Sequence, residues 1–231
     1  MPIHMLRELE KLQKMVLSLG AMTEENLRRA VSSITNRDQK LALQAIDMDH
    51  EVDKFEVEVE EECLKVLALY QPVAHDLRFI VAILKINHDL ERIGDLAVNV
   101  AQRAHKLATF PKNAHDFGIQ DLAESVQRVV SNALDAFIAS DAELARQIWL
   151  GDDEVDNKTG QVLTALEDEA RKRPESLQGL LSLIAVAHTL ERIADHATNI
   201  TKDVLYMVHG EIVRHRSREF REQLPPTPPP S

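Results

Sequence analysis

One polar phrase occurs twice in this sequence, and it constrains the fold more than any other feature. The first copy runs from His88 to Val100 (HDLERIGDLAVNV) and the second from His188 to Ile200 (HTLERIADHATNI). Both copies contain apolar residues, as two helices would, but they also share a histidine, a glutamate, an arginine, an aspartate and an asparagine. Because a hydrophobic core does not require those polar side chains, a shared ligand chemistry is the leading explanation for their recurrence.

The repeat extends well beyond this phrase. The segment from Asp38 to Asp53 corresponds to the segment from Asp141 to Asp156, with matching Leu, Ala, Gln, Asp, Glu and Val residues. Two half-chains therefore follow one plan, and gene duplication is the simplest origin. The last segment, 211–231, is charged and Pro-rich, and we expect this tail to be disordered. The expected units are a first three-helix repeat at 1–110, a second at 111–210 and the tail at 211–231.

Composition and periodicity predict an all-α protein. Glycines number only seven, Leu, Ala, Val, Glu, Arg and Ile recur at helical spacing, and no alternating β-branched run stands out. Asp38 and Asp141 are expected N-caps, and Pro72 and Pro174 mark helix starts. The expected helices span 4–35, 38–70 and 73–108, then 116–139, 141–172 and 174–209. Helices of this length are typical of bundles, so we expect two tandem three-helix bundles, end to end or side by side.

The charge balance excludes one class of partner. Lys and Arg number 27 against 38 Asp and Glu, giving a net charge of −11, whereas nucleic-acid binding needs clustered positive charge. The single Cys63 fits a reducing compartment. No secretory signal is evident, and the longest apolar run, 79–84, is too short to span a bilayer. We therefore expect a cytoplasmic protein without nucleic-acid binding or direct membrane insertion.

A helical wheel places the polar residues of the repeated phrase on the outer face of each bundle. Their spacing also brings acidic residues together, because carboxylates four positions apart on a helix have Cβ atoms about 5–6 Å apart. Two like charges held that close repel each other unless a cation lies beside them. The spacing occurs at four places: Asp49/Asp53, Glu91/Asp95, Asp152/Asp156 and Glu191/Asp195.

The four carboxylate pairs predict two related cation sites. If the second and third helices of each half are antiparallel neighbours, their pairs face each other and surround one ion or a small cluster. Oxygen ligands of this kind favour Fe, Mn, Mg, Ca or Zn. An explanation without metal stays open, since an exposed acidic stripe is usually solvated and Arg92 can pair with Glu91 or Asp95. His88 and His188 are expected to be hydrogen-bonding partners rather than ligands.

Catalytic motifs are missing from the sequence. It contains no Gly-rich phosphate loop, no Ser or Cys nucleophile motif and no His-Glu-x-x-His, so we expect no enzyme, no catalytic residues and no organic cofactor. A di-iron or metal-storage protein is the main rival, although that class needs inward carboxylates and Glu-x-x-His pairs. A helical adaptor that needs no metal is the other alternative.

The doubled motif resembles that of a known family. Two three-helix units, each with Leu-Glu-Arg-Ile-(Gly/Ala)-Asp-x-Ala-x-Asn, resemble the PhoU family of bacterial phosphate-specific transport. The stretch 71–78 (QPVAHDLR) is similar to the one that opens the third helix in that family. The resemblance runs from about Leu6 to His215, nearly the whole chain. The second half has RPES at 173–176 in place of the first stretch, which sets the two halves apart.

The resemblance implies a cytoplasmic, non-enzymatic negative regulator of phosphate uptake and of the phosphate-starvation response. Proteins of this family act as adaptors between the ATPase subunit of the phosphate ABC importer and a sensor histidine kinase, and they often form homodimers. It also implies surface metal clusters, of iron or zinc, on the Glu/Asp-x-x-x-Asp motifs. The implied metal ligands are Asp49, Asp53, Glu91, Asp95, Asn99, Asp152, Asp156, Glu191, Asp195 and Asn199.

Overall fold

The computed structural model describes residues 3–110 and 116–212 of the chain. Within these ranges the regular elements are all helical, which confirms the expected all-α class. The helices are α1 (Ile3–Asn36), α2 (Gln39–Tyr70), α3 (Ala74–Leu107), α4 (Ile119–Ala139), α5 (Ala142–Leu150), α6 (Asp153–Lys172) and α7 (Leu177–His209), with a 3₁₀ turn at Pro174–Ser176. Most of the expected disordered tail, from residue 213 onward, lies outside the described residues.

The expected capping residues begin and end the helices. Asp38 accepts a hydrogen bond of 3.0 Å from the backbone N–H of Leu41, and so begins α2. Asp141 begins α5 in the same way, by accepting from two backbone N–H groups of the first turn. Gly210 ends α7 with a φ of 77°, a left-handed conformation that glycine adopts without strain. The two Asp caps confirm that the corresponding breaks of the repeats are built alike.

One expected helix is wrong. The segment 141–172 was expected to be continuous, but it forms two helices, α5 and α6, with a break at Gly151 and Asp152. The backbone N–H of Gly151 donates to the carbonyls of Gln147 and Ile148, which closes the last turn of α5. Met48 stands at the corresponding place in the first repeat, where α2 continues unbroken. The glycine, with its low helix propensity, accounts for the difference.

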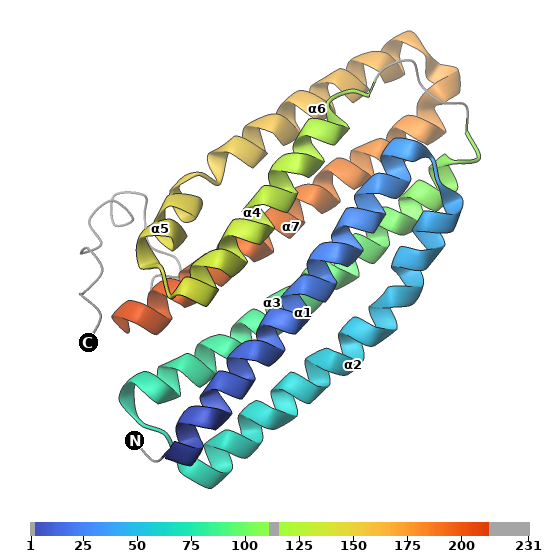
Figure 1. Cartoon of the computed structure of the whole chain (residues 1–231). Helices are drawn as coiled ribbons and strands as arrows, with labels where there is room; N and C mark the ends of the chain where they lie inside the picture. Colours follow the sequence, from blue (N-terminus) through green and yellow to red (C-terminus); the bar gives the residue numbers. More distant parts are fainter. Residues whose placement is uncertain (1–2, 111–115, 213–231) are drawn as a thin grey trace.

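The two bundles lie side by side along their whole length (Figure 1). Helices α1 to α3 form one bundle, α4 to α7 form the other, and the central contact is an antiparallel pairing of α3 with α7. Helix α1 packs against α4 on one side of this pair, whereas α2 and α6 lie at the outer edges. The inner-face residues expected from the helical wheel are all buried: Ile83, Ile86, Leu90, Ile93, Ala97, Val100, Leu183, Val186, Leu190, Ile193, Ala197 and Ile200.

Two polar links cross the interface between α3 and α7. Lys85 Nζ lies 3.1 Å from Asp203 Oδ1, and His196 Nδ1 lies 2.8 Å from Asp89 Oδ1. The counterparts of these four residues in the other repeat are Ala185, Arg103, Leu96 and Thr189. Each link therefore uses positions at which the repeats differ, and each needs one residue from each half. The two halves have therefore diverged at the interface, so that each contributes residues to these links that the other half lacks.

The repeated phrases lie near the middle of α3 and α7, away from both ends of the elongated molecule. Across the part of the chain that the structure describes, no helix is long and apolar enough to cross a membrane.

Candidate metal centres on the repeated helices

The first carboxylate cluster lies between α2 and α3. Helix α2 supplies Asp49 and Asp53, and α3 supplies Glu91 and Asp95. The two helices approach closely at Gly94, where an added Cβ would lie 3.6 Å from Asp49 Oδ1 and 3.3 Å from a methyl group of Val52. Because glycine has no Cβ, Asp49 reaches the backbone of α3 beside Asp95. The antiparallel neighbourhood that the sequence hypothesis required is therefore present.

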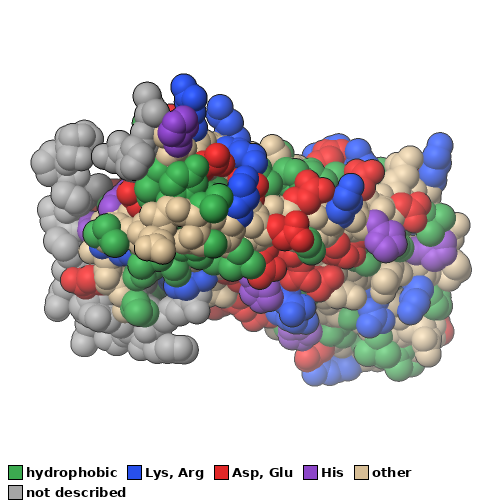
Figure 2. Space-filling view, turned by 90° about the horizontal axis from the view of Figure 1, so that it is seen from below, with side chains coloured by type: hydrophobic (Ala, Val, Ile, Leu, Met, Phe, Trp, Pro, Cys, Tyr) green, Lys and Arg blue, Asp and Glu red, His purple; other side chains and the backbone are tan. Residues whose placement is uncertain are grey.

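Three of these four carboxylates, those of Asp53, Glu91 and Asp95, line a shallow hollow of about 290 Å³ on the surface. Acidic side chains gather over the middle of the face seen in Figure 2, which agrees with the outward stripe expected from the wheel. Burial varies along this acidic stripe, since the Glu91 side chain is 23% exposed and that of Asp95 is 41% exposed. The lining residues are Asp53, Glu56, Val57, His88, Glu91, Arg92 and Asp95.

The negative charges within this cluster raise the pKa values of two of its carboxylates, Asp49 and Glu91. Burial first, and then the charges of Asp53, Asp95 and Glu91, together raise the pKa of Asp49 to about 6. Burial, followed by the charge of Asp95, also raises the pKa of Glu91, against the opposing effect of Arg92. A partly buried group of like charges is costly, and either protons or a cation lower that cost.

Arg92 compensates part of this charge. Its guanidinium lies 3.2 Å from Asp95 Oδ2 and 3.5 Å from Glu91 Oε2, so the steadying role expected for Arg92 is present. The compensation is partial, because Asp49 Oδ1 and Glu91 Oε2 are buried without a hydrogen bond, although Glu91 Oε2 keeps its ion-pair contact with Arg92. Buried polar atoms normally have a partner, and orphaned carboxylate oxygens are the donors that a hard cation prefers.

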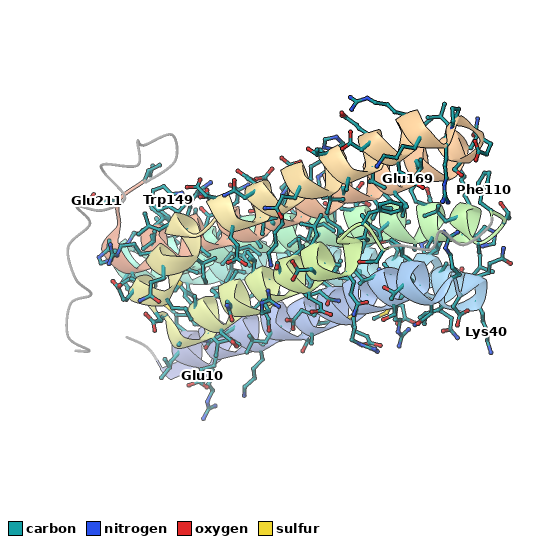
Figure 3. All side chains as sticks on the ribbon, turned by 90° about the horizontal axis from the view of Figure 1, so that it is seen from above. Glu10, Lys40, Phe110, Trp149, Glu169 and Glu211 are labelled. Carbon is teal, nitrogen blue, oxygen red and sulfur yellow. The ribbon has the colours of Figure 1, made fainter. Side chains whose placement is uncertain are left out.

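The second cluster repeats the arrangement between α6 and α7. Burial raises the pKa of Asp156, and the charges of Asp195, Glu191 and Asp152 raise it further. Burial and then Glu191 raise the pKa of Asp195, whereas Lys202 and His196 act in the opposite direction. The structure therefore brings all four expected carboxylates of this half into one electrostatic group. Figure 3 shows α6 running from near Trp149 toward Glu169 above α7.

The two clusters are compensated differently. In the second, Asp152 and Asp156 lie at the N-terminus of α6, where the helix dipole favours negative charge. Lys202 adds a positive charge and donates a hydrogen bond of 3.1 Å to Asn199. His188 Nδ1 lies 3.3 Å from Glu191 Oε2, in the partner role expected for this histidine. Of the two expected Asn ligands, Asn99 is exposed and Asn199 is half-buried.

One member of the first cluster was missed by the sequence hypothesis. Glu56 is half-buried, lines the hollow and accepts a hydrogen bond of 2.7 Å from Asn87 Nδ2. Burial raises its pKa, and the neighbouring charges of Glu60 and Glu91 act in the same direction. Comparison of the repeats hid this residue, because Thr159 stands at the corresponding position. Its place three residues after Asp53, on the same helix face, was the available signal.

The donor chemistry fits a cation, although the side chains do not yet converge on one. Over residues 3–110 and 116–212, no three His, Cys, Asp or Glu side chains are arranged to hold a single metal ion. Mutual repulsion keeps uncompensated carboxylates apart, and a bound cation would draw them together by rotation of their side chains. The buried oxygens of Asp49 and Glu91 that make no hydrogen bond are placed to take part in that rearrangement.

Known proteins resemble this chain over both of its repeats. The PhoU domain is found twice, at residues 16–104 and 119–204. A phosphate-specific transport system accessory protein PhoU homologue of Pseudomonas putida is 36% identical over 209 residues, covering 90% of this chain and 82% of that protein. The corresponding homologue of Pseudomonas aeruginosa is 37% identical over 209 residues, covering 90% of this chain and 86% of that protein.

Two solved structures have the same fold. PhoU from Pseudomonas aeruginosa superimposes with a TM-score of 0.85 at 36% identity, covering 89% of this chain and 99% of that one. The phosphate transport system regulatory protein PhoU from Streptococcus pneumoniae gives a TM-score of 0.84 at 26% identity, covering 90% and 99%. The expected fold, two repeated helical units in tandem, is confirmed by these matches.

Proposed function

This chain belongs to the PhoU family, a family of accessory and regulatory proteins rather than enzymes, and we propose that it restrains phosphate uptake and the phosphate-starvation response. The proposal extends to this chain the role that its relatives' names carry, a phosphate-specific transport system accessory protein. A similarity that covers nine-tenths of this chain, including both repeats, supports that extension.

We propose that it acts in the cytoplasm as an adaptor, between the ATPase subunit of a phosphate ABC importer and a sensor histidine kinase. Its acidic clusters offer a docking face for basic patches on such partners, since opposite charges speed encounter and select orientation. The net charge of −11 supports electrostatic attraction of this kind. We further propose that the protein works as a homodimer.

We propose that each carboxylate cluster holds metal ions, iron or zinc by family resemblance. The observation that carries this proposal is the recurrence of one arrangement in both halves, four carboxylates on two neighbouring helices. The pKa shifts of Asp49 and Asp156, on the two outer-edge helices, show the electrostatic strain that a cation would relieve. A bound cation would also order the docking face by fixing the side chains around it.

Removal of two carboxylates from one cluster tests the docking role. We expect Glu91→Ala with Asp95→Ala to weaken binding to the importer ATPase subunit at least tenfold, because it removes half of the first cluster. Binding is measured by surface plasmon resonance with the purified subunit, and circular dichroism is expected to show unchanged helicity, since both side chains line the surface hollow and lie outside the apolar core.

The matched control removes two carboxylates elsewhere. Glu167 and Asp168 on α6 are exposed and pair with Arg171, so Glu167→Ala with Asp168→Ala changes the net charge equally. Equal weakening by both double variants would show that general charge, and not the cluster, guides docking. Oxygen-dependent turnover of ferrous iron by the unmodified protein would instead favour the di-iron alternative, and ATPase binding that survives chelation would favour an adaptor without metal.

A further inference from the structure

Two polar side chains are buried without partners in the core of the first bundle. Thr23 and Asn26 lie on the inner face of α1 and are fully buried. The hydroxyl of Thr23 and both polar atoms of the Asn26 amide have no hydrogen-bond partner in the protein. Their neighbours along the same face, Leu19 and Ala30, are apolar and equally buried. An unpaired amide costs stability in such a place, so a compensating role is expected.

The contacts between helices place Asn26 level with the first carboxylate cluster. Lys11 on α1 pairs with Glu62 on α2 at 3.0 Å. Moving equally far along these two antiparallel helices brings Asn26 level with residue 47 on α2, and the next turn of α2 includes Asp49. Asp49 is the residue of this turn on the inner stripe, because it lies between the buried Ala45 and Val52 at core spacing.

Helix α3 completes the same layer. The side chain of Arg37, at the end of α1, donates to the backbone carbonyl of Leu107, so α1 and α3 run in parallel. The same offset brings Asn26 level with Leu96 and Ala97, one turn or less from Gly94. Asp49 Oδ1, which is buried and unpaired, lies 3.6 Å from the place of a Cβ on Gly94. One core layer therefore holds an unpaired amide and an unpaired carboxylate oxygen.

The second bundle differs at the corresponding positions. Val126 and Val129 stand where the first bundle has Thr23 and Asn26, and Ala194 stands where it has Gly94. The second cluster therefore lacks a counterpart of the Thr23 and Asn26 pair, although Ser125 and Thr159 are buried polar residues elsewhere in that bundle. The carboxylate motif alone does not record this difference, because it is the same in both halves.

We propose that Asn26 is a positioning residue of the first carboxylate cluster, whose buried amide holds the inner oxygen of Asp49 through a bridging water molecule. The water donates to Asp49 Oδ1 and accepts from Asn26 Nδ2, which pairs two buried atoms that the protein leaves unpaired. Asp49 is thereby held in one orientation from inside, and its other oxygen is left for the surface. The consequence for cations rests on the proposed function: the first cluster binds a divalent cation more tightly than the second.

A double-mutant cycle tests the Asn26–Asp49 link without any metal. The variants are Asn26→Val, Asp49→Ala and the double variant, unfolded with urea in the presence of a chelator. We expect Asn26→Val to lower the folding equilibrium constant at least fivefold more when Asp49 is present than when Ala replaces it. Effects that add to within twofold would overturn the proposal.

Two further variants act as controls for this cycle. Asn26→Thr differs from Asn26→Val only by a hydroxyl in place of a methyl group, so it should restore much of the coupling to Asp49; no restoration would contradict a hydrogen-bonding role. If the valine variant fails to fold, Asn26→Thr replaces it in the cycle. The matched control pairs Asn26→Val with Asp152→Ala in the second half, where we expect additive effects.

Binding of Mn²⁺, followed by electron paramagnetic resonance, tests the consequence for cations. In a background with Glu191→Gln and Asp195→Asn, which keeps only the first cluster, Asn26→Val should weaken Mn²⁺ binding about tenfold. In a background with Glu91→Gln and Asp95→Asn, it should change nothing; equal weakening in both would contradict the proposal. If neither background binds Mn²⁺ before Asn26 is changed, the proposed metal function is wrong, and the cycle in chelator still decides the role of Asn26.

Discussion

Asp49, in the first carboxylate cluster, shows how burial and like charges act together to shift the pKa of one residue. It lies at the inner edge of a group of four carboxylates, with one oxygen buried and unpaired. Its pKa rises from an ordinary value of 3.8 to about 6, first because of burial and then because of its acidic neighbours. The folded protein therefore holds a proton there more tightly than the unfolded chain does.

This shift predicts a stability that falls as the pH rises. Between about pH 4 and pH 6 the folded state binds more protons at Asp49 than the unfolded state, so its contribution is lost as the pH passes through that window. Allowing for partial exposure, Asp49→Asn should raise the metal-free stability at pH 8 by on the order of 1–2 kcal/mol and flatten the pH dependence. Urea denaturation in chelator at several pH values measures both effects.

An exposed aspartate on the same helix provides the control. Asp47→Asn removes the same charge from α2 outside the cluster, and we expect little change in stability or in its pH dependence. If Asp47→Asn and Asp49→Asn flatten the profile equally, the effect belongs to the net charge of −11 and not to the cluster.

At this scale the sequence predicted part of the site. Repeated spacing was sufficient to find the eight clustered carboxylates, because i and i+4 positions share a helix face wherever the helix lies. The depth of each side chain could not be found in this way. It depends on Gly94, which lets α2 approach, and the cluster also includes Glu56, which has Thr159 as its counterpart and so leaves no trace in the repeat.

Among the helices, the break between α5 and α6 has the clearest consequence. Gly151 ends α5, and α6 then begins with acidic residues at Asp152 and Asp153. The second cluster thereby gains the favourable field of a helix N-terminus, whereas the first lies within a continuous helix. Periodicity predicted the long helices and their caps correctly, but it joined α5 to α6, because a single glycine is often tolerated inside a helix.

Glycine substitutions test how well the helices are understood. Gly160 lies inside α6, is exposed and has no atom within 4 Å of the place of an added Cβ. We expect Gly160→Ala to raise the free energy of unfolding by about 0.5–1 kcal/mol, because alanine favours the helix. Gly210→Ala should lower it by about 1 kcal/mol, because the φ of 77° strains any L-residue.

Thermal and urea unfolding measure these two effects side by side. Stabilisation by both substitutions would contradict the left-handed ending of α7, and destabilisation by both would contradict the open surroundings of Gly160.

At the scale of the whole molecule, the antiparallel pairing of α3 with α7 makes two repeats into one body. The wheel predicted an apolar inner face for each of these helices, yet it left open whether the bundles stack or lie side by side. Amphipathic faces alone did not decide between these arrangements. The side-by-side form uses both inner faces at once, and the polar links across the interface fix its register.

The link between Lys85 and Asp203 predicts how strongly this interface depends on a buried charge. Asp203 is 1% exposed, so Lys85→Met leaves a buried carboxylate without that partner and should cost about 2–3 kcal/mol. Adding Asp203→Leu should recover much of the loss, because it removes the buried charge that Lys85 had balanced. Urea denaturation measures both, and a double variant no more stable than Lys85→Met would show that Asp203 has another essential role.

The central claim is that the doubled phrase builds two related cation sites, and metal content tests it most directly. The protein is purified without an affinity tag and analysed by inductively coupled plasma mass spectrometry. We expect bound metal in the unmodified chain and a partial loss in Glu91→Gln/Asp95→Asn. Adding Glu191→Gln and Asp195→Asn should remove the rest, with helicity unchanged in both variants. A metal content that is negligible in the unmodified chain, or that survives in the quadruple variant, would contradict the claim.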